Sequence, residues 1–375
     1  MNRVLRGGHS RYKNILQQGR LTRRRLKLRR ANATARPGGT VAVIGLLRSS
    51  SGLGESARIF SRGCRNAGFS VLPLDLSSRM HGFDRSVAFE QASLHRFSLV
   101  PERHADTVVV HLNGRLAVDA LAAMDLPSVG RAWRVAYWHW ELPALPKSWR
   151  AAADYFNEIW VPSVFVRDAV APHVSAPVRV LPHCLNVKTP TAGMRRRLGI
   201  SDDAFVALAA FDYRSSIRRK NPIGAIEAFR RAFGDDPSAQ LVLKSTHGAL
   251  FPREVAEVAE AIGDSRNIRT VDQIMSREEM WGLIDAADSV ISLHRSEGFG
   301  LVPAEAMLLG KPVVATDWSA TSEFLDDLNG LPVPYELVPV EDPVQYRGFS
   351  DQRWAEPDLD AAADGLARLR QSPLM

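Results

Sequence analysis

Short apolar runs alternate with helical patterns along most of the chain from residue 40 onward. The first series of apolar runs is TVAVIGLL, SVLPLDL, DTVVVHLN, RVAYWHW, EIWVPS and VRVLPH. Short runs that are apolar at nearly every position are typical of parallel strands buried on both faces, with helices between them. The pattern therefore predicts a parallel sheet covered by helices in residues 40–186.

A second alternation begins after a polar segment that contains proline, LPHCLNVKTPTAGMRRRLGISDD. Its apolar runs are FVALAAFD, AQLVLKS, NIRTVDQ, SVISLHRS and KPVVATDWS. We expect two doubly wound, Rossmann-like α/β domains, at 40–186 and 204–345, with a linker at 187–203 and a tail at 346–375. Ligands of open α/β sheets bind beyond the carboxyl ends of the strands, so two such domains facing each other would border a central cleft.

The composition is that of a globular protein, but the charge is distributed unevenly. The chain has 375 residues, a length that fits two domains, with 45% apolar and 24% charged residues. Residues 1–40 contain twelve Lys or Arg and no Asp or Glu, whereas the rest has 36 basic and 41 acidic residues. The net charge of +7 therefore comes from a basic arm, residues 1–39, and not from the expected domains.

Three interpretations of the basic arm are compatible with its residues. It is a disordered extension, a segment in which residues 1–36 bind an anionic membrane surface, or an Arg-rich transit peptide. Nucleic-acid binding is disfavoured because Tyr12 is the arm's one aromatic residue. We favour the membrane surface, and expect a cytoplasmic protein that is peripheral on the inner face of the plasma membrane. The two cysteines, Cys64 and Cys184, fit a reducing compartment.

The segment GLLRSSSGLGESAR joins the first expected strand to a helix. Gly52, Gly54 and Ala57 match the spacing G-x-G-x-x-A, and Asp75 follows near the end of the next strand, as in a dinucleotide-binding fingerprint. The match is imperfect because LLRSSS separates the strand from the first glycine. A plain flexible loop and an anion site at a helix N-terminus are both compatible with this segment.

Further candidates follow the expected strands. His139, in YWHWELP, stands at a strand's carboxyl end, where a hydrogen-bonded core residue and a catalytic residue are both possible. FDYRSSIRRKNP places four cations between a strand and a helix that begins near Pro222; they are Arg214, Arg218, Arg219 and Lys220. A solvated surface would explain these cations, but we favour a diphosphate site, because guanidinium and ammonium groups near a helix N-terminus bind phosphate.

The segment SLHRSEGFGLVPAEAMLLGKPVVATDWSA carries the most specific signal. Glu297 lies in a loop after a strand, and Glu305 is expected in the first turn of a helix with Pro303 at its first position. Gly298 and Gly300 leave backbone amides open to a ligand at that helix N-terminus. The arrangement favours a site for a polyhydroxylated, phosphorylated molecule.

At this point the chain resembles a known family. SEGFGLVPAEAMLLGKPVVAT resembles the Glu-x7-Glu signature of family 4 glycosyltransferases, which are retaining enzymes of GT-B fold. Other segments resemble, in the same order, bacterial members that act in polysaccharide and lipopolysaccharide assembly; these are GLLRSSSGLGESAR, YWHWELPALPKSW, EIWVPSVFVRDAV, RRKNP and WAEPDLDAAA. The resemblance covers the chain from about residue 40 to its end.

The resemblance implies a role for each matching residue. Glu297 would hold the donor sugar and steady positive charge at its anomeric carbon, and Glu305 would bind the nucleotide ribose. Arg219 and Lys220 would hold the leaving diphosphate. The amides of Gly298, Phe299 and Gly300 would hold sugar and phosphate oxygens. Gly52 and Gly54 match the glycine loop of the family's N-terminal domain, which closes over phosphates and acceptor, and His139 falls near the family's conserved-loop histidine.

Three departures from the family pattern are visible. Val302 and Pro303 stand where Thr or Ser is commoner, and DWSATSEF replaces a Ser-Gly-Asn run. The resemblance also implies a terminal helix beyond RLRQSPLM, so we expect the 346–375 tail to be truncated, which leaves open an inactive subunit that only binds the nucleotide sugar.

The expected reaction moves a hexose from a GDP or UDP sugar to a glycan or lipid-linked acceptor, with retention. Asp358-Leu359-Asp360 is the one Asp-x-Asp tripeptide, and we expect it to cap a helix rather than bind a metal. Fixed cations would replace the metal, and no cofactor is expected beyond the donor. The main alternative is an NAD(P)-dependent oxidoreductase based on Gly52, Gly54, Ala57 and Asp75.

Overall fold

The computed structural model describes residues 39–371, apart from 79, 81–82, 90–104, 125–128 and 130. The basic arm, with its membrane, disorder and transit-peptide interpretations, lies outside the described residues. Within the described part of the chain, every helix is too short or too polar to cross a lipid bilayer.

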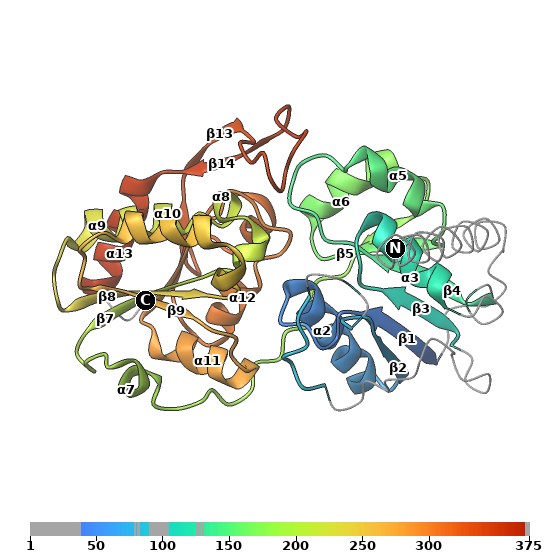
Figure 1. The fold of residues 1–375 in the computed structure, drawn as a ribbon, viewed down its shortest axis with the longest axis horizontal. Coiled ribbons are helices and arrows are strands. Elements are labelled where there is room, and N and C mark those ends of the chain that lie inside the picture. The colour runs from blue at the N-terminus through green and yellow to red at the C-terminus, as the bar shows by residue number, and fades with distance from the viewer. Residues whose placement is uncertain are drawn as a thin grey trace, which may run out of the picture. The chain divides into compact units, whose positions relative to one another are not determined.

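The first sheet contains six parallel strands in the order β2-β1-β3-β4-β5-β6 (Figure 1). Each of the six expected apolar runs of the first series coincides, fully or within one residue, with one of these strands. The strands are β1 (Thr40–Gly45), β2 (Ser70–Asp75), β3 (Thr107–Val110), β4 (Trp133–Tyr137), β5 (Glu158–Val161) and β6 (Val178–Val180); the helices between them include α2 (Gly52–Asn66), α3 (Gly114–Ala123), α5 (Lys147–Ala153) and α6 (Val164–Val170).

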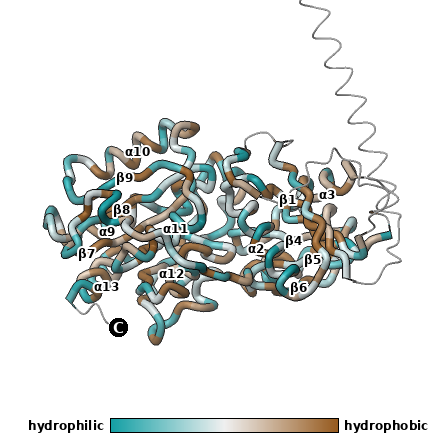
Figure 2. Tube along the Cα trace, turned by 90° about the horizontal axis from the view of Figure 1, so that it is seen from below, coloured by the Kyte–Doolittle hydropathy of each residue, from teal (hydrophilic) through white to brown (hydrophobic). Residues whose placement is uncertain are grey.

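The first sheet is buried because its central strands are apolar on both faces. All four residues of β3 are buried, and in β4 every residue after Trp133 is buried. Figure 2 shows hydrophobic stretches among the labelled strands β1, β4 and β5. Val43, Val109 and Val135 form a core with Ala57 of α2, so helix α2 covers one face of the sheet.

The second sheet is also parallel, with six strands in the order β12-β11-β10-β7-β8-β9. Its strands are β7 (Phe205–Ala210), β8 (Ala239–Ser245), β9 (Ile268–Asp272), β10 (Ser289–Ser292), β11 (Val313–Thr316) and β12 (Leu331–Val333). Its helices are α7 (Met194–Leu198), α8 (Ile217–Lys220), α9 (Pro222–Phe233), α10 (Pro252–Ile262), α11 (Arg277–Ala286), α12 (Leu301–Leu308) and α13 (Leu359–Gln371). The strand of each expected run is present, and β12 was not expected from the sequence.

Alternate residues of β7 belong to different cores. Phe205 and Ala207 pack in a cluster that includes residues of α9, α10 and α13. Val206 and Leu208 pack in a second cluster with residues of α7, α11 and α12. Because successive side chains of a strand point to opposite faces, the sheet is covered by helices on both sides. This is the doubly wound arrangement that the apolar runs predict.

An antiparallel ribbon and helix α13 lie outside the second parallel sheet, near the end of the described residues. β13 (Tyr335–Pro339) and β14 (Arg353–Pro357) form an antiparallel ribbon, which the sequence did not predict. Asp358 accepts hydrogen bonds from the backbone amides of Asp360 and Ala361, at 2.9 and 3.1 Å, and so caps α13. The Asp-x-Asp tripeptide thus has the capping function expected of it.

The chain divides into two compact units, each built around one parallel sheet. The first comprises the described residues up to His139 together with Leu145–Pro162 and Arg167–Cys184. The second comprises Trp140–Ala144, Ser163–Val166 and the described residues from Leu185 onward. The segment expected to be a linker contains α7, whose Met194 is buried in the second core. Two Rossmann-like units in one chain confirm the predicted α/β fold class.

Candidate functional site

The second sheet has a topological switch point between β7 and β10. These two strands are neighbours, although β8 and β9 come between them in the sequence. The chain therefore leaves β7 and β10 in opposite directions, and in open α/β sheets ligands usually bind beyond the carboxyl ends of the strands at such a point. The loop after β7 leads to Arg219 and Lys220, and the loop after β10 contains Glu297.

Glu297 forms ion pairs with both cations of the β7 loop. Its Oε1 accepts a hydrogen bond from a terminal nitrogen of Arg219 at 3.1 Å and another from Nζ of Lys220. The same Arg219 nitrogen also donates to the carbonyl oxygen of Ser296 at 2.8 Å. Arg219 and Glu297 are only 4% and 9% exposed, so these charges are largely removed from water. We call Arg219, Lys220 and Glu297 the charged triad.

The charged triad keeps its carboxylate ionised despite burial. Burial by itself would raise the pKa of Glu297, but Lys220 and Arg219 lower it to about 2. For Arg219, burial acts to lower the pKa, while Tyr346 and Glu297 raise it above its usual value. A buried carboxylate beside two fixed cations is a preformed electrostatic site, because its charges are already oriented and partly desolvated.

A strained turn positions the two cations. Ser216 precedes α8 with a φ of 62°, an unusual value for a residue other than glycine. Its hydroxyl accepts a hydrogen bond from the backbone amide of Arg219 at 3.1 Å and donates one to Asp342 at 2.5 Å. Asn221, with a φ of 52°, ends α8 and caps α9 through its side chain. Strained residues of this kind persist where the surrounding structure holds them, which is common at functional sites.

The structure separates the four cations that the sequence groups together. Only Arg219 and Lys220 of the four pair with Glu297. Arg214 pairs with Asp212 at 3.0 Å, and exposed Arg218 pairs with Glu257 at 2.6 Å. Arg214 lies before α8, and within α8 the adjacent side chains of Arg218 and Arg219 point in different directions. Arg218 and Arg219 therefore provide an internal comparison between an exposed and a buried cation.

Helix α12 begins earlier than the sequence analysis expected. Gly300, with a φ of 91°, is its N-cap, and Leu301 is the first helical residue, so the expectation that Pro303 begins the helix was wrong. Glycine adopts this left-handed conformation without steric cost, which lets the chain turn into the helix at once. Pro303 is tolerated in the first turn because its missing N–H has no helical acceptor there. Glu305 consequently lies in the second turn rather than the first.

The loop between Glu297 and α12 is held by close packing. A Cβ on Gly298 would lie 2.9 Å from the carbonyl oxygen of Trp140, in a segment that belongs to the same unit. A Cβ on Gly300 would lie 2.6 Å from a methyl group of Thr321. The ring of Phe299 packs against Phe324 with centroids 5.8 Å apart. Both glycines therefore have a packing requirement in addition to any ligand they face.

Glu305 has a partner that sequence reasoning missed. Its carboxylate is 1% exposed, and its Oε1 is paired with Arg277, the first residue of α11. Its Oε2 is buried and has no hydrogen-bond partner among the described residues. Ser276 and Glu279 form a capping box that fixes the start of α11. That S-x-x-E signature, directly after the NIRTVDQ strand, is the sequence signal that locates Arg277.

Ser319 is a second residue that sequence reasoning missed. Its hydroxyl accepts a hydrogen bond from the backbone amide of Glu297 at 2.8 Å, and it adopts a φ of 66°. It lies in the DWSATSEF segment, which departs from the family pattern. Ser319 therefore helps to fix the backbone from which Glu297 extends.

In the first unit, the glycine-rich segment forms a tight loop before α2. Gly52 begins α2, and the side chain of the N-cap Ser51 accepts from the amide of Gly54 at 3.2 Å. A Cβ on Gly54 would lie 2.5 Å from two carbonyl oxygens of the loop, so glycine is required there for packing. One oxygen of Asp75 accepts from the Arg48 amide at 3.2 Å and the Ser77 hydroxyl at 2.6 Å. Asp75 thus stabilises this loop, a structural function that the oxidoreductase interpretation did not consider.

His139 lies two residues beyond β4 in a cluster of buried and partly buried rings. Its Nε2 lies 3.4 Å from Nε2 of His183, and its backbone amide donates to Asn113 at 2.9 Å. Burial lowers the pKa of His139 well below the usual value, and nearby His183 and His111 lower it further. At neutral pH His139 is therefore uncharged, so it is equipped to accept or donate hydrogen bonds rather than to bind an anion.

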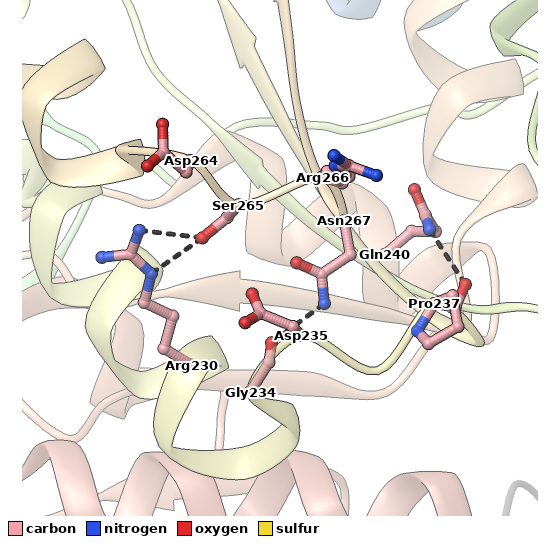
Figure 3. Close-up of a pocket in the computed structure, with 9 residues that line it drawn as sticks. All are labelled: Arg230, Gly234, Asp235, Pro237, Gln240, Asp264, Ser265, Arg266 and Asn267. Atoms are coloured by element: carbon pink, nitrogen blue, oxygen red, sulfur yellow. Dashed lines mark hydrogen bonds between the residues drawn. The ribbon is translucent and has the colours of Figure 1, made fainter.

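A cavity of about 640 Å³ lies near the amino ends of strands of the second sheet (Figure 3). Its lining includes Arg230 of α9, Gln240 near the start of β8 and Asn267 just before β9. Arg230 donates to the hydroxyl of Ser265 at 2.8 Å, so its guanidinium is tied to the wall. The charged triad follows the carboxyl ends of the strands, which lie at the opposite end of a parallel sheet. The cavity is therefore separate from the charged triad.

No cluster of three or more His, Cys, Asp and Glu side chains suited to a metal ion occurs within the described residues.

Comparison with known proteins points to one class. Residues 209–346, which contain the charged triad and Glu305, match the family model described as glycosyl transferases group 1. The chain is 32% identical over 132 residues to the D-inositol 3-phosphate glycosyltransferase of Geodermatophilus obscurus, and the match spans 32% of this chain and 28% of that protein.

Solved structures resemble the chain over most of its length. Sucrose-phosphate synthase from Thermosynechococcus elongatus matches with a TM-score of 0.61 and 18% identity, over 90% of each chain. The Anabaena protein HepE, in complex with UDP and glucose, matches with a TM-score of 0.57 and 13% identity, over 89% of this chain and 95% of that one. The chain therefore has the two-domain GT-B fold, and the sequence matches support a glycosyltransferase.

Proposed function

We propose that this protein is a retaining, metal-independent glycosyltransferase of the family 4 type. It transfers a hexose from a nucleotide-diphosphate sugar to a glycan or a lipid-linked acceptor. The observation that carries the proposal is the charged triad, in which a buried carboxylate is held by Arg219 and Lys220 at the switch point of the second sheet. The match of residues 209–346 to glycosyl transferases group 1 supports it independently.

Arg219 and Lys220 hold the donor diphosphate in this proposal. Negative charge grows on the diphosphate as the bond to the sugar breaks, and fixed cations stabilise that charge without reorganising. Nε of Arg219 is buried and has no hydrogen-bond partner among the described residues, which leaves a donor for a phosphate oxygen. The N-terminus of α12, whose cap Gly300 has no side chain, adds the amides near Gly298 and Phe299 as further donors.

Glu297 acts on the sugar. An ionised carboxylate accepts hydrogen bonds from hexose hydroxyls, and it stabilises the positive charge that develops at the anomeric carbon. With its pKa lowered to about 2, Glu297 is ionised throughout the neutral range and does not serve as a general acid. Retention of configuration follows from the resemblance of the Glu297 and Glu305 spacing to the family signature.

Glu305 binds the nucleotide in this proposal, and the first unit contributes the acceptor side. The buried Oε2 of Glu305 accepts a ribose hydroxyl while Arg277 holds the other oxygen. The loop that contains Gly52 and Gly54 contacts phosphate or acceptor oxygens, although the amide of Gly54 also donates to the Ser51 hydroxyl. His139 contacts a substrate hydroxyl. Assembly of polysaccharide or lipopolysaccharide is the proposed setting, as in the bacterial proteins that the sequence resembles.

A thermal-shift panel of UDP, GDP and ADP sugars tests the proposal most directly. A ligand that binds the folded protein raises its Tm by mass action, so the correct donor should give the largest shift. HepE is known in complex with UDP and glucose, which makes UDP-glucose the first donor to test. The matched control is NADPH, which should leave the Tm unchanged. A shift with NADPH and none with any nucleotide sugar would overturn the proposal in favour of an oxidoreductase.

Binding must be followed by a turnover assay. The best donor is incubated with a glycan or lipid-linked acceptor in EDTA, and nucleoside diphosphate release and product configuration are measured. We expect transfer without added metal and with retention. Donor binding without hydrolysis or transfer to any acceptor would identify a binding subunit instead.

The basic arm supports a membrane-bound acceptor. Each basic residue near an anionic bilayer contributes roughly 1 kcal/mol to binding, and the arm has twelve within residues 1–40. We expect the full chain to co-sediment with phosphatidylglycerol vesicles, and a variant that lacks residues 1–36 to remain in the supernatant. Equal sedimentation of both proteins would remove the arm from the proposal.

A further inference from the structure

The first unit contains a stack of four rings at the carboxyl ends of its strands. His111 directly follows β3, Tyr137 ends β4, His139 lies two residues later, and His183 follows β6. Ring centroids are 4.6 Å apart for His111 and Tyr137, 5.6 Å for Tyr137 and His183, and 5.4 Å for His139 and His183. These three pairs are stacked, so the rings hold one another in fixed orientations.

The direction of each hydrogen bond in this stack is determined by Tyr137. Its hydroxyl donates to the carbonyl oxygen of Leu181 at 2.5 Å, and a carbonyl oxygen only accepts. The phenol has a single hydrogen, which this bond uses. Nδ1 of His183 lies 3.3 Å from the same phenol oxygen, so His183 must be the donor in that contact.

The imidazoles of His183 and His139 are both neutral, so the position of the hydrogen on His183 determines its position on His139. Burial lowers the pKa of His183 to about 4, against the opposing effect of Glu55, and the pKa of His139 lies well below its usual value. A neutral imidazole has one N–H, so His183 with its hydrogen on Nδ1 has a lone pair on Nε2. Nε2 of His139, 3.4 Å away, must then donate to it. The hydrogen of His139 is on Nε2, and its Nδ1 has a lone pair.

Nδ1 of His139 is the last atom in this series of hydrogen bonds. His139 as a whole residue is partly exposed, but its Nδ1 is buried and has no hydrogen-bond partner among the described residues. An unpartnered buried acceptor is costly, so such atoms in native proteins usually have a functional reason. The position just beyond β4 is at the carboxyl ends of the strands, the side on which ligands of open α/β sheets bind. A lone pair there selects an O–H donor and repels an anionic oxygen.

We propose that Tyr137 and His183 are positioning residues that hold His139 as its Nε2–H tautomer, so that Nδ1 accepts a hydrogen bond from a substrate hydroxyl. The tautomer follows from the contacts of the first unit alone. Its use on a sugar hydroxyl rests on the proposed glycosyl transfer. The two parts are therefore tested by different measurements.

The tautomer is read directly by long-range ¹H–¹⁵N correlation spectra of imidazole-labelled protein at pH 7.5. The signals are assigned from His139→Gln and His183→Gln variants. We expect His139 to have a protonated Nε2 and an unprotonated Nδ1, and His183 to have the reverse. A protonated Nδ1 on His139, or a charged His183, would overturn the proposal without reference to any activity.

Tyr137→Phe tests the positioning role, because it removes the hydroxyl while keeping a ring in the stack. We expect both histidines to shift towards mixed tautomers, and kcat to fall about fivefold, as for the loss of one hydrogen bond. The nucleotide Kd should be unchanged. Tyr155→Phe is the matched control, because no side-chain hydrogen bond of Tyr155 is found in the described structure, and it should alter neither spectrum nor kcat.

Two results separate this proposal from the proposed function. Unaltered tautomers in Tyr137→Phe would refute the positioning role, even if transfer is observed. The expected tautomers together with no transfer from any nucleotide sugar would refute the glycosyl transfer and leave the tautomer assignment intact.

Discussion

The two units have the same architecture but opposite electrostatics at the carboxyl ends of their strands. In the first unit, His111, His139 and His183 are held neutral, because burial without a strong counter-ion disfavours the charged imidazole. In the second, Glu297 is equally hidden from water but stays ionised, because Arg219 and Lys220 compensate its burial. Burial thus selects neutrality or charge according to the partners that the fold supplies. The neutral stack suits hydroxyl recognition, and the charged triad suits a diphosphate sugar.

The largest expected effect comes from neutralising the carboxylate of the charged triad. Glu297→Gln keeps the shape of the side chain but removes its charge, so we expect kcat to fall about 10²- to 10³-fold, as when one preorganised group is lost. The nucleotide Kd should change little. Steady-state kinetics and calorimetry measure the two quantities, with exposed Glu260→Gln as the control. Near-normal turnover would show that charge at residue 297 is dispensable.

Replacing the buried cation should mainly weaken nucleotide binding. Arg219→Met retains much of the apolar stem and removes the guanidinium, so we expect the Kd for the donor nucleotide to rise about 10- to 100-fold, the value of a charged hydrogen bond. Arg218→Met alters the adjacent residue, which is exposed and paired with Glu257, and should bind normally. Calorimetry on both variants checks this. Equal losses would mean that overall charge, and not the triad geometry, controls affinity.

Replacing either Glu305 or Arg277 should have a smaller effect, mainly on the affinity for the nucleotide. Either Glu305→Ala or Arg277→Ala should raise the nucleotide Kd about tenfold, with kcat reduced less, since one charged hydrogen bond is weakened. The double variant should be no worse than the more damaging single one, because the two side chains act as a unit. Exposed Arg253→Ala is the control. Additive losses in the double variant would show that Arg277 acts independently of Glu305.

The contrast between the units should also appear in the pH dependence of stability. The pKa of His183 is about 4 in the folded protein and about 6.5 in the unfolded chain. The free energy of unfolding should therefore decrease as the pH falls from about 6.5 towards 4, because the unfolded chain binds the proton more readily. Glu297 has a lowered pKa, so its contribution is lost only below about 4.5. Urea denaturation between pH 7.5 and 5 should therefore show a decline that is smaller in His183→Gln and unchanged in Glu297→Gln. The reverse pattern would contradict the assignment of neutral and charged sites.

The sequence predicted the fold well because its signal is local. Runs such as TVAVIGLL are apolar at nearly every position, which is typical of a strand buried on both faces. The strands that escaped prediction, β12, β13 and β14, are short or lie in a peripheral ribbon, where burial is partial and alternation is weak. The start of α12 was misplaced because Pro303 is a stronger sequence signal than Gly300, although the glycine conformation decides where the helix begins.

The sequence by itself determined two wound sheets, the Glu297 and Glu305 spacing, and cations after the first strand of the second sheet. Only the tertiary structure decided which cations reach Glu297, that Arg277 pairs with Glu305, and that Tyr137 and His183 orient His139. Residue types and periodicity are local features of the sequence. Ion pairs and hydrogen-bond directions depend on side chains that are far apart in the sequence and are brought together by the order of the strands. Arg218 and Arg219 make the point, since adjacent and identical residues acquire different partners once the helix fixes their directions.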